Sequence, residues 1–172
     1  MKETTDAIGL SVRVQNESVF PSYWEELGAR TASVATSKTY YSMKTKHVNS
    51  ADNNWIVYGN ESQYEMAPLV TSMRYWFIPE LVVISKSALK NMPAREQYIV
   101  MKCAEEAGEY QKKLFKAKEM EAKKRAIDGG CEIVQLTRKE RQAFKQAAEE
   151  VYRNLTSKHK EMISRIEELA EE

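Results

Sequence analysis

The chain has 172 residues, of which 42% are hydrophobic and 30% are charged, with only six glycines and four prolines. This composition excludes a disordered, collagen-like or low-complexity protein, and the length is sufficient for one well-packed core. The 26 basic and 25 acidic residues leave a net charge of +1, so no excess charge attracts the chain to nucleic acid.

Common catalytic and metal-binding signatures are absent from the sequence. There is no G-x-S-x-G, no H-E-x-x-H and no phosphate-binding loop, so the sequence does not indicate an enzyme. Cys103 and Cys131 have no C-x-x-C or histidine pairing that would bind zinc, and we expect neither a metal nor a cofactor. No apolar run approaches the roughly 20 residues of a membrane span, and the polar first residues do not resemble a signal peptide.

Short strands and helices are predicted to alternate in the first half of the chain. Residues 10–14 alternate apolar and polar side chains, as in a half-buried strand. Apolar residues recur every three or four positions over residues 19–29, which predicts a helix that ends near Gly28. Ser37 is the expected N-cap of a further short helix. Short strands are expected at residues 32–35, 70–75 and 81–85, the last of them continuous and buried. This order indicates an α/β fold.

The second half is dominated by one long predicted helix. Residues 94–128 contain no glycine or proline except Gly108, and an apolar stripe at helical spacing runs from Ile99 to Ala117. Such a helix would measure roughly 50 Å, which exceeds what a compact domain of this size needs. A strand is expected at residues 132–136. Thr137 and Glu140 form a capping-box pattern for a helix to about Leu155, and an amphipathic helix follows over residues 160–172.

Several short segments occur in a defined order along the chain, and together they indicate a protein family. The first is Asp6-Ala7-Ile8-Gly9-Leu10-Ser11-Val12-Arg13-Val14, and further segments follow at residues 27–29, 34–40, 48–53, 64–65 and 82–86. The series resembles the solute-binding proteins of TRAP transporters, the DctP-like family, whose first segment reads D-x-x-G-x-x-x-R-V. The resemblance covers nearly the whole chain, and its weight comes from the order and spacing of the segments.

The resemblance implies an α/β fold of the periplasmic-binding-protein type (type II-like), with a mixed sheet, packed helices and one very long bridging helix. Residues 1–90 would form a ligand-cleft region, residues 91–128 the bridging helix, and residues 129–172 a C-terminal strand and helices. The implied function is capture of a small organic acid by its carboxylate, outside the cytoplasm or in the periplasm, and its delivery to TRAP permease subunits in the membrane, with no catalysis.

The resemblance also suggests where this chain stands within the family pattern. Its series starts part-way through that pattern, so we interpret the chain as a truncated receptor that lacks the start of the first domain. Strand edges and apolar faces that are left uncovered would favour self-association of the chain.

The family comparison indicates which side chains would bind the acid. Arg13 occupies the position of the arginine that grips the carboxylate, and a planar guanidinium offers two parallel N–H donors to that group. Asn53 and Asn16 are the expected supporting donors, and Thr36 stands where many members have a pocket phenylalanine. Three further residues lie near a family pocket segment, namely Arg74, Tyr75 and Trp76. The pocket floor is therefore expected to differ from that of sialic-acid and C4-dicarboxylate receptors.

Structural interpretations of the same residues remain open. A buried arginine on a strand is often part of an ion pair, and Asn53 also suits a turn or a helix cap. Tyr75, Trp76 and Phe77 also suit a core or an interface. The alternative for the whole chain is a helical protein–protein interaction module that uses residues 94–128, although the stripe lacks the sustained heptads of a coiled coil.

Overall fold

The computed structural model describes residues 1–15, 19–75 and 78–171 of the chain. The α-helices are α1 (Val19–Glu26), α2 (Thr39–Lys44), α3 (Trp55–Asn60), α4 (Lys86–Lys90), α5 (Ala94–Asp128), α6 (Arg138–Ala147), α7 (Glu149–Arg153) and α8 (Ser157–Glu171). The strands are β1 (Ser11–Val14), β2 (Arg30–Ser33), β3 (Ser50–Ala51), β4 (Leu69–Ser72) and β5 (Glu132–Gln135). Short 3-10 helices are η1 (Thr4–Ala7), η2 (Thr36–Lys38) and η3 (Gln63–Glu65). Within these ranges no helix is both long and apolar enough to cross a membrane.

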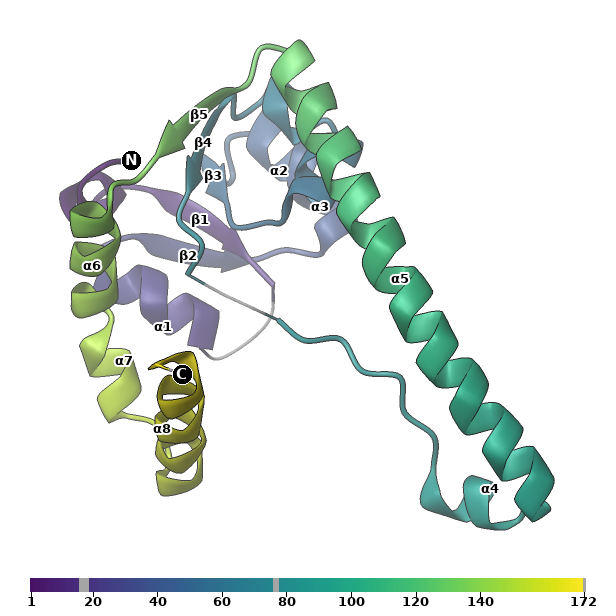
Figure 1. Ribbon diagram of the computed structural model, residues 1–172. Coiled ribbons are helices and arrows are strands. Elements are labelled where there is room, and N and C mark those ends of the chain that lie inside the picture. The colour runs from purple at the N-terminus through teal and green to yellow at the C-terminus, as the bar shows by residue number, and fades with distance from the viewer. Residues whose placement is uncertain (16–18, 76–77, 172) are drawn as a thin grey trace.

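The strands form two small parallel sheets. One sheet has the order β2-β1-β3, and the other pairs β4 with β5. A mixed sheet was predicted, whereas every pairing among the described strands is parallel. Parallel neighbours need crossover connections, and α1, α2 and the loop before β3 supply them here. Strand β5 pairs with β4 although the long helix α5 separates them in sequence, so the C-terminal region returns to the first half of the chain (Figure 1).

The core lies around the central strand β1. Val12 and Val14 are each 1% exposed, and they belong to the same apolar cluster as Trp24 of α1 and Phe144 of α6. Since side chains alternate along a strand, Arg13 between the two valines points to the other face of the sheet. That face is also covered, because Arg13 is only 1% exposed. The core therefore holds β1 in place while β1 holds Arg13.

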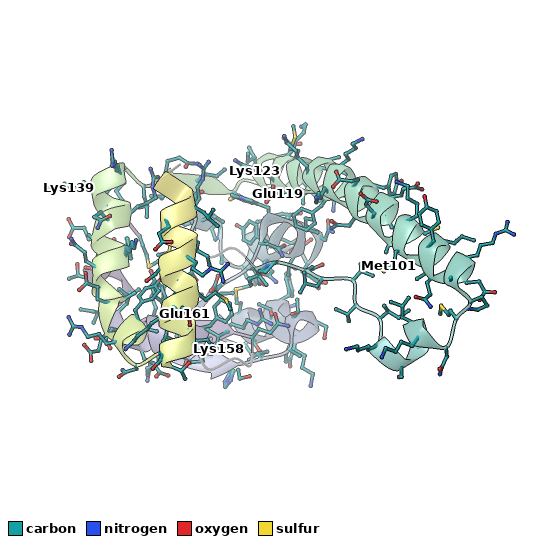
Figure 2. All side chains as sticks on the ribbon, turned by 60° about the horizontal axis from the view of Figure 1, so that its bottom comes forward. Met101, Glu119, Lys123, Lys139, Lys158 and Glu161 are labelled. Atoms are coloured by element: carbon teal, nitrogen blue, oxygen red, sulfur yellow. The ribbon has the colours of Figure 1, made fainter. Side chains whose placement is uncertain are left out.

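Among the described residues, helix α5 contacts the body at its C-terminal end. Ala122 and Ala126 are buried, and a Cβ added at Gly59 of α3 would overlap the Ala122 carbonyl, so the two helices are in close contact. The Lys123 ammonium lies 5.2 Å from the centre of the Trp55 ring, a cation–π contact across the same junction. In Figure 2, Lys123 and Glu119 lie on the part of α5 beside the body, whereas Met101 lies on the part that extends past it.

Residues 78–115 form a projecting arm, which consists of an extended segment, α4 and the first two thirds of α5 (Figure 1). The strand predicted at residues 81–85 is wrong: the segment up to Ser85 is not a strand, and Leu81, Val82 and Val83 are about 80% exposed, at 80%, 79% and 82%. A strand needs a neighbour to satisfy its backbone groups, and none of the described residues pairs with this segment.

Other sequence predictions are confirmed or corrected at the element ends. The 35-residue helix α5 runs through Gly108 without a break, as predicted, and the Thr137–Glu140 capping box is present. Ser37 is not an N-cap, because it lies inside η2 and Lys38 precedes α2. The helix expected to reach Leu155 ends at Ala147, where the chain turns into α7.

Candidate functional site

The site is built around the buried guanidinium of Arg13. Its Nε donates to the carbonyl oxygen of Val34 at 2.8 Å, and Nη2 donates to Thr36 Oγ1 at 3.0 Å. Nη1 donates to Asn53 Oδ1 at 3.3 Å, the longest of the three bonds. Each acceptor comes from a segment that follows a strand of the three-stranded sheet, because Val34 and Thr36 follow β2 and Asn53 follows β3. The carboxyl ends of these parallel strands therefore converge on one arginine.

The charge of Arg13 has little compensation. All three acceptors are neutral oxygens, and no acidic side chain within residues 1–15, 19–75 and 78–171 forms an ion pair with it. Burial lowers the pKa of the Arg13 guanidinium, and the negative charge of Asp52 opposes that shift. A buried charge without an ion pair costs roughly several kcal/mol, so this arrangement is what an anion-binding site needs before its ligand arrives.

A second amide side chain lies behind Asn53. Asn53 Nδ2 donates to Gln63 Oε1 at 2.9 Å, so Asn53 bridges Arg13 and Gln63. Gln63 is 1% exposed, and its own Nε2 has no hydrogen-bond partner in the described part of the chain. It is the first residue of η3, and Ser62 before it has a φ of 50°, which turns the chain back towards Asn53.

An aromatic cluster borders the site on the side of Asp52. Asp52 Oδ2 accepts a hydrogen bond from Trp24 Nε1 at 3.4 Å and another from the Tyr75 hydroxyl. Tyr75 stacks on Tyr23 with the ring centres 4.8 Å apart. Burial raises the pKa of the Asp52 carboxyl, and the hydrogen bonds from Tyr75 and Trp24 together with the charge of Arg13 lower it. The cluster thus keeps a second charged group close to Arg13.

The structure brings together part of the predicted site. Arg13, Thr36 and Asn53 are directly bonded, and Tyr75 is connected to them through Asp52, which precedes Asn53. Arg74 is exposed, with a φ of 55°, and forms no hydrogen bond or ion pair with the described residues. The predicted residues Asn16 and Trp76 lie outside the described residues.

The structure bears on the three structural alternatives for Asn53, Arg13 and Tyr75. The helix cap that was considered for Asn53 belongs to its neighbour, because Asn54 Oδ1 accepts from the Val57 amide at the start of α3. The ion pair that was considered for Arg13 is not formed within the described ranges. Tyr75 is half-buried among aromatic rings, which agrees with the core alternative for this residue, whereas Phe77 lies outside the described residues.

The sequence did not single out Asp52 or Gln63. The position of Asp52, next to Asn53 in a polar turn that follows a strand, was a usable signal. A single glutamine in a polar segment such as residues 60–65 carries no such signal. In the described part of the chain no cluster of three or more histidine, cysteine or acidic side chains is arranged to hold a metal ion.

Comparison with known proteins gives one consistent result. Residues 1–159 match the family described as bacterial extracellular solute-binding protein, family 7 (DctP). A solute-binding protein of Chromohalobacter salexigens is 24% identical over 168 residues, which are 97% of this chain and 49% of that protein. The C4-dicarboxylate-binding periplasmic protein DctP of Vibrio cholerae is 28% identical over 95 residues, covering 54% of this chain and 29% of that protein.

A solved structure supports the same fold. The crystal structure of a TRAP periplasmic solute-binding protein from Sulfitobacter sp. NAS-14.1 with bound β-D-galacturonate has a TM-score of 0.86 and 28% identity. The alignment covers 95% of this chain and 54% of that one. The chain therefore has the type II-like fold of these receptors, and it spans about half of the length of the relatives it matches along most of its own length.

Proposed function

This chain belongs to family 7 of the bacterial extracellular solute-binding proteins, and from that premise we propose that it provides the carboxylate-binding side of a TRAP-type receptor. In this proposal the receptor captures a small organic acid outside the cytoplasm, in the periplasm, and delivers it to the permease subunits in the membrane. It catalyses no reaction. The alternative, an interaction module formed by α5, is not favoured, because the family match extends far beyond this helix.

The observation that carries the proposal is the buried Arg13, which forms no ion pair with the described residues. A guanidinium has five N–H donors, and its bonds to Val34, Thr36 and Asn53 use one donor on each nitrogen. One donor then remains on each Nη atom, which is the number that a bidentate carboxylate accepts. The bond from Nε to Val34 fixes the plane of the guanidinium, so these donors keep a defined direction.

The substrate class follows from the group that the relatives' ligands have in common. The Sulfitobacter protein binds β-D-galacturonate, and the Vibrio protein is named for C4-dicarboxylates; both ligands carry a carboxylate. The Thr36 hydroxyl and the Asn53 amide lie beside Arg13 and are suited to hydroxyl or carboxyl oxygens. We propose a small hydroxylated or dicarboxylic acid as the ligand of the receptor.

The proposed organisation of the chain has three parts. Residues 1–90 contain the ligand-binding sheet, residues 91–128 include the bridging helix α5, and residues 129–172 return to the first part through β5. The arm consists of the end of the first part and most of the second. We propose that the apolar side chains of the arm are covered by another part of the receptor when the receptor functions. When the chain is alone, a second copy of it covers them.

Titration of the chain with D-galacturonate and with succinate, followed by amide chemical shifts in NMR, tests the function. NMR is appropriate because it detects weak binding, which we expect from a chain with half of the family's length. Charge-assisted hydrogen bonds contribute roughly 1.5–3 kcal/mol each, so Arg13→Ala should weaken binding by two or more orders of magnitude and abolish the shifts. Arg13→Lys should restore little of the binding, because an ammonium cannot offer the two parallel N–H donors of a guanidinium.

Arg138→Ala is the matched control, since Arg138 is an exposed arginine at the start of α6. It should bind the acids as the parent does. An Arg13→Ala variant that binds as tightly as the parent would show that Arg13 has a structural role. Either that result or a parent chain that binds neither acid would refute the proposed function.

A further inference from the structure

The amide of Gln63 is an unusual group for a protein interior. It is 1% exposed, its Oε1 accepts from Asn53, and its Nε2 lacks a partner among the described residues. A buried donor without an acceptor costs roughly 1–3 kcal/mol, whereas an aliphatic side chain of similar size would avoid that cost. A glutamine here therefore needs a reason beyond packing, and the neighbouring Asn53 suggests one.

Asn53 faces Arg13 with the wrong atom for binding an acid. Its Oδ1 accepts from Arg13 Nη1, while its Nδ2 is directed to Gln63. An incoming carboxylate oxygen would meet the amide oxygen of Asn53, and two acceptors next to each other repel. Arg13 is only 1% exposed, so a carboxylate reaches the guanidinium only after a neighbour moves. Asn53 is the neighbour that forms the longest bond, at 3.3 Å, compared with 3.0 Å for Thr36.

A half-turn of the Asn53 amide about χ2 would solve this problem. The terminal torsion of asparagine is broad and roughly two-fold, so the turned amide occupies nearly the same space. Nδ2 would then donate to the carboxylate, which also accepts from the Arg13 Nη1 that Oδ1 releases, and Oδ1 would face Gln63. Glutamine carries both a donor and an acceptor at its end, so a matching half-turn presents Nε2 to Oδ1 and keeps the bond between the two side chains. The number of unpartnered atoms on Gln63 stays the same.

We infer that Gln63 is a positioning residue that stabilises the Asn53 amide in both orientations, bonded to Arg13 without ligand and turned towards the carboxylate with ligand. The inference rests on the proposed function and assigns a role to a residue that does not itself touch the acid. It explains why both ends of the Gln63 amide are needed. A side chain that can only accept, or that can do neither, stabilises at most one of the two orientations.

Two substitutions of similar size separate these requirements. Gln63→Glu only accepts at pH 8, so it holds Asn53 in the ligand-free orientation and should weaken D-galacturonate binding at least tenfold. At pH 5 a buried carboxyl is protonated in part and regains a donor, so much of that loss should be recovered. Gln63→Met neither donates nor accepts, and it should weaken binding severalfold to the same extent at both pH values. Gln111→Glu, on the exposed surface of the arm, adds the same charge and should bind as the parent does.

The measurement is the same NMR titration, with circular dichroism and thermal unfolding to establish that each variant is folded. Binding by folded Gln63→Met within twofold of the parent would overturn the inference, as would a Gln63→Glu variant that binds equally at pH 8 and pH 5. If Gln63→Met does not fold, the inference is judged by whether Gln63→Glu regains D-galacturonate binding at pH 5. The proposed function is judged separately by Arg13→Ala: it stands if that variant loses binding while both Gln63 variants retain it. A parent that binds no acid overturns both.

Discussion

The body around β1 and the projecting arm use similar apolar residues with opposite results. In the body, Val12 and Val14 are buried by α1 and α6, and this packing fixes the strand that carries Arg13. In the arm, Val82 and Val83 are exposed, because no described element lies against them. An apolar run therefore indicates that a segment is suited to burial, but the partner that buries it lies elsewhere. The proposed binding site lies in the region where that partner is present.

The junction between the two regions gives the largest expected effect on stability. Gly59 of α3 contacts the backbone of α5 at Ala122, so Gly59→Ala would force the helices apart. Because the neighbour is the backbone of Ala122 and not a flexible side chain, we expect a loss of about 3 kcal/mol in the free energy of unfolding, measured by urea denaturation.

The matched control lies on the arm. A Cβ at Gly108 meets nothing within 4 Å, and alanine is the better helix former, so Gly108→Ala should raise helix stability by up to about 1 kcal/mol. Equal effects of the two substitutions would contradict the close contact of α3 with α5.

The exposed side chains of the arm give the next largest effect, on association. We expect the chain to self-associate at concentrations of about 100 µM in sedimentation velocity, because contiguous apolar surface on an extended segment attracts a second copy. Val83→Glu should weaken that association at least tenfold, since Val83 is 82% exposed within the apolar run. Tyr41→Glu, at a residue of the body that is 68% exposed, should leave it unchanged. A monomer at every concentration would refute self-association through the arm.

The sequence predicted the two regions unequally well. Alternation identified β1, and helical spacing identified the whole of α5, because both signals are local. The family resemblance added Arg13, Thr36 and Asn53, which the structure joins by direct hydrogen bonds. The strand at residues 81–85 failed because pairing depends on a partner strand, which an apolar run does not specify.

The remaining parts of the site were beyond local patterns. Gln63 reaches Asn53 because Ser62 adopts a left-handed conformation at the start of η3. A serine in the sequence does not predict that conformation. Arg74 and Tyr75 are adjacent in sequence, yet only Tyr75 is directed to Asp52. The side of the chain on which each residue lies was decided by tertiary packing.

The smallest expected effect is a pH dependence that arises within the body. Burial raises the pKa of Asp52 above its ordinary value of 3.8, so the folded chain binds a proton more readily than the unfolded chain does. The contribution of this group to the free energy of unfolding therefore rises as pH falls through the raised pKa, and it is complete below the ordinary value. Asp52→Asn removes that dependence. Its stability relative to the parent should be higher at pH 7 than at pH 4, as measured by urea denaturation at the two pH values.

Asp6 provides a control of opposite sign. Backbone hydrogen bonds from Lys2 and Glu3 lower the pKa of its exposed carboxyl, so the stability that Asp6 contributes is present at neutral pH and is lost as pH falls through the lowered pKa. Asp6→Asn should therefore be less stable than the parent at pH 7, and the difference should shrink as the pH falls through the lowered pKa of Asp6. If both variants changed in the same direction relative to the parent, burial by the Trp24 and Tyr75 cluster would not be what controls the protonation of Asp52.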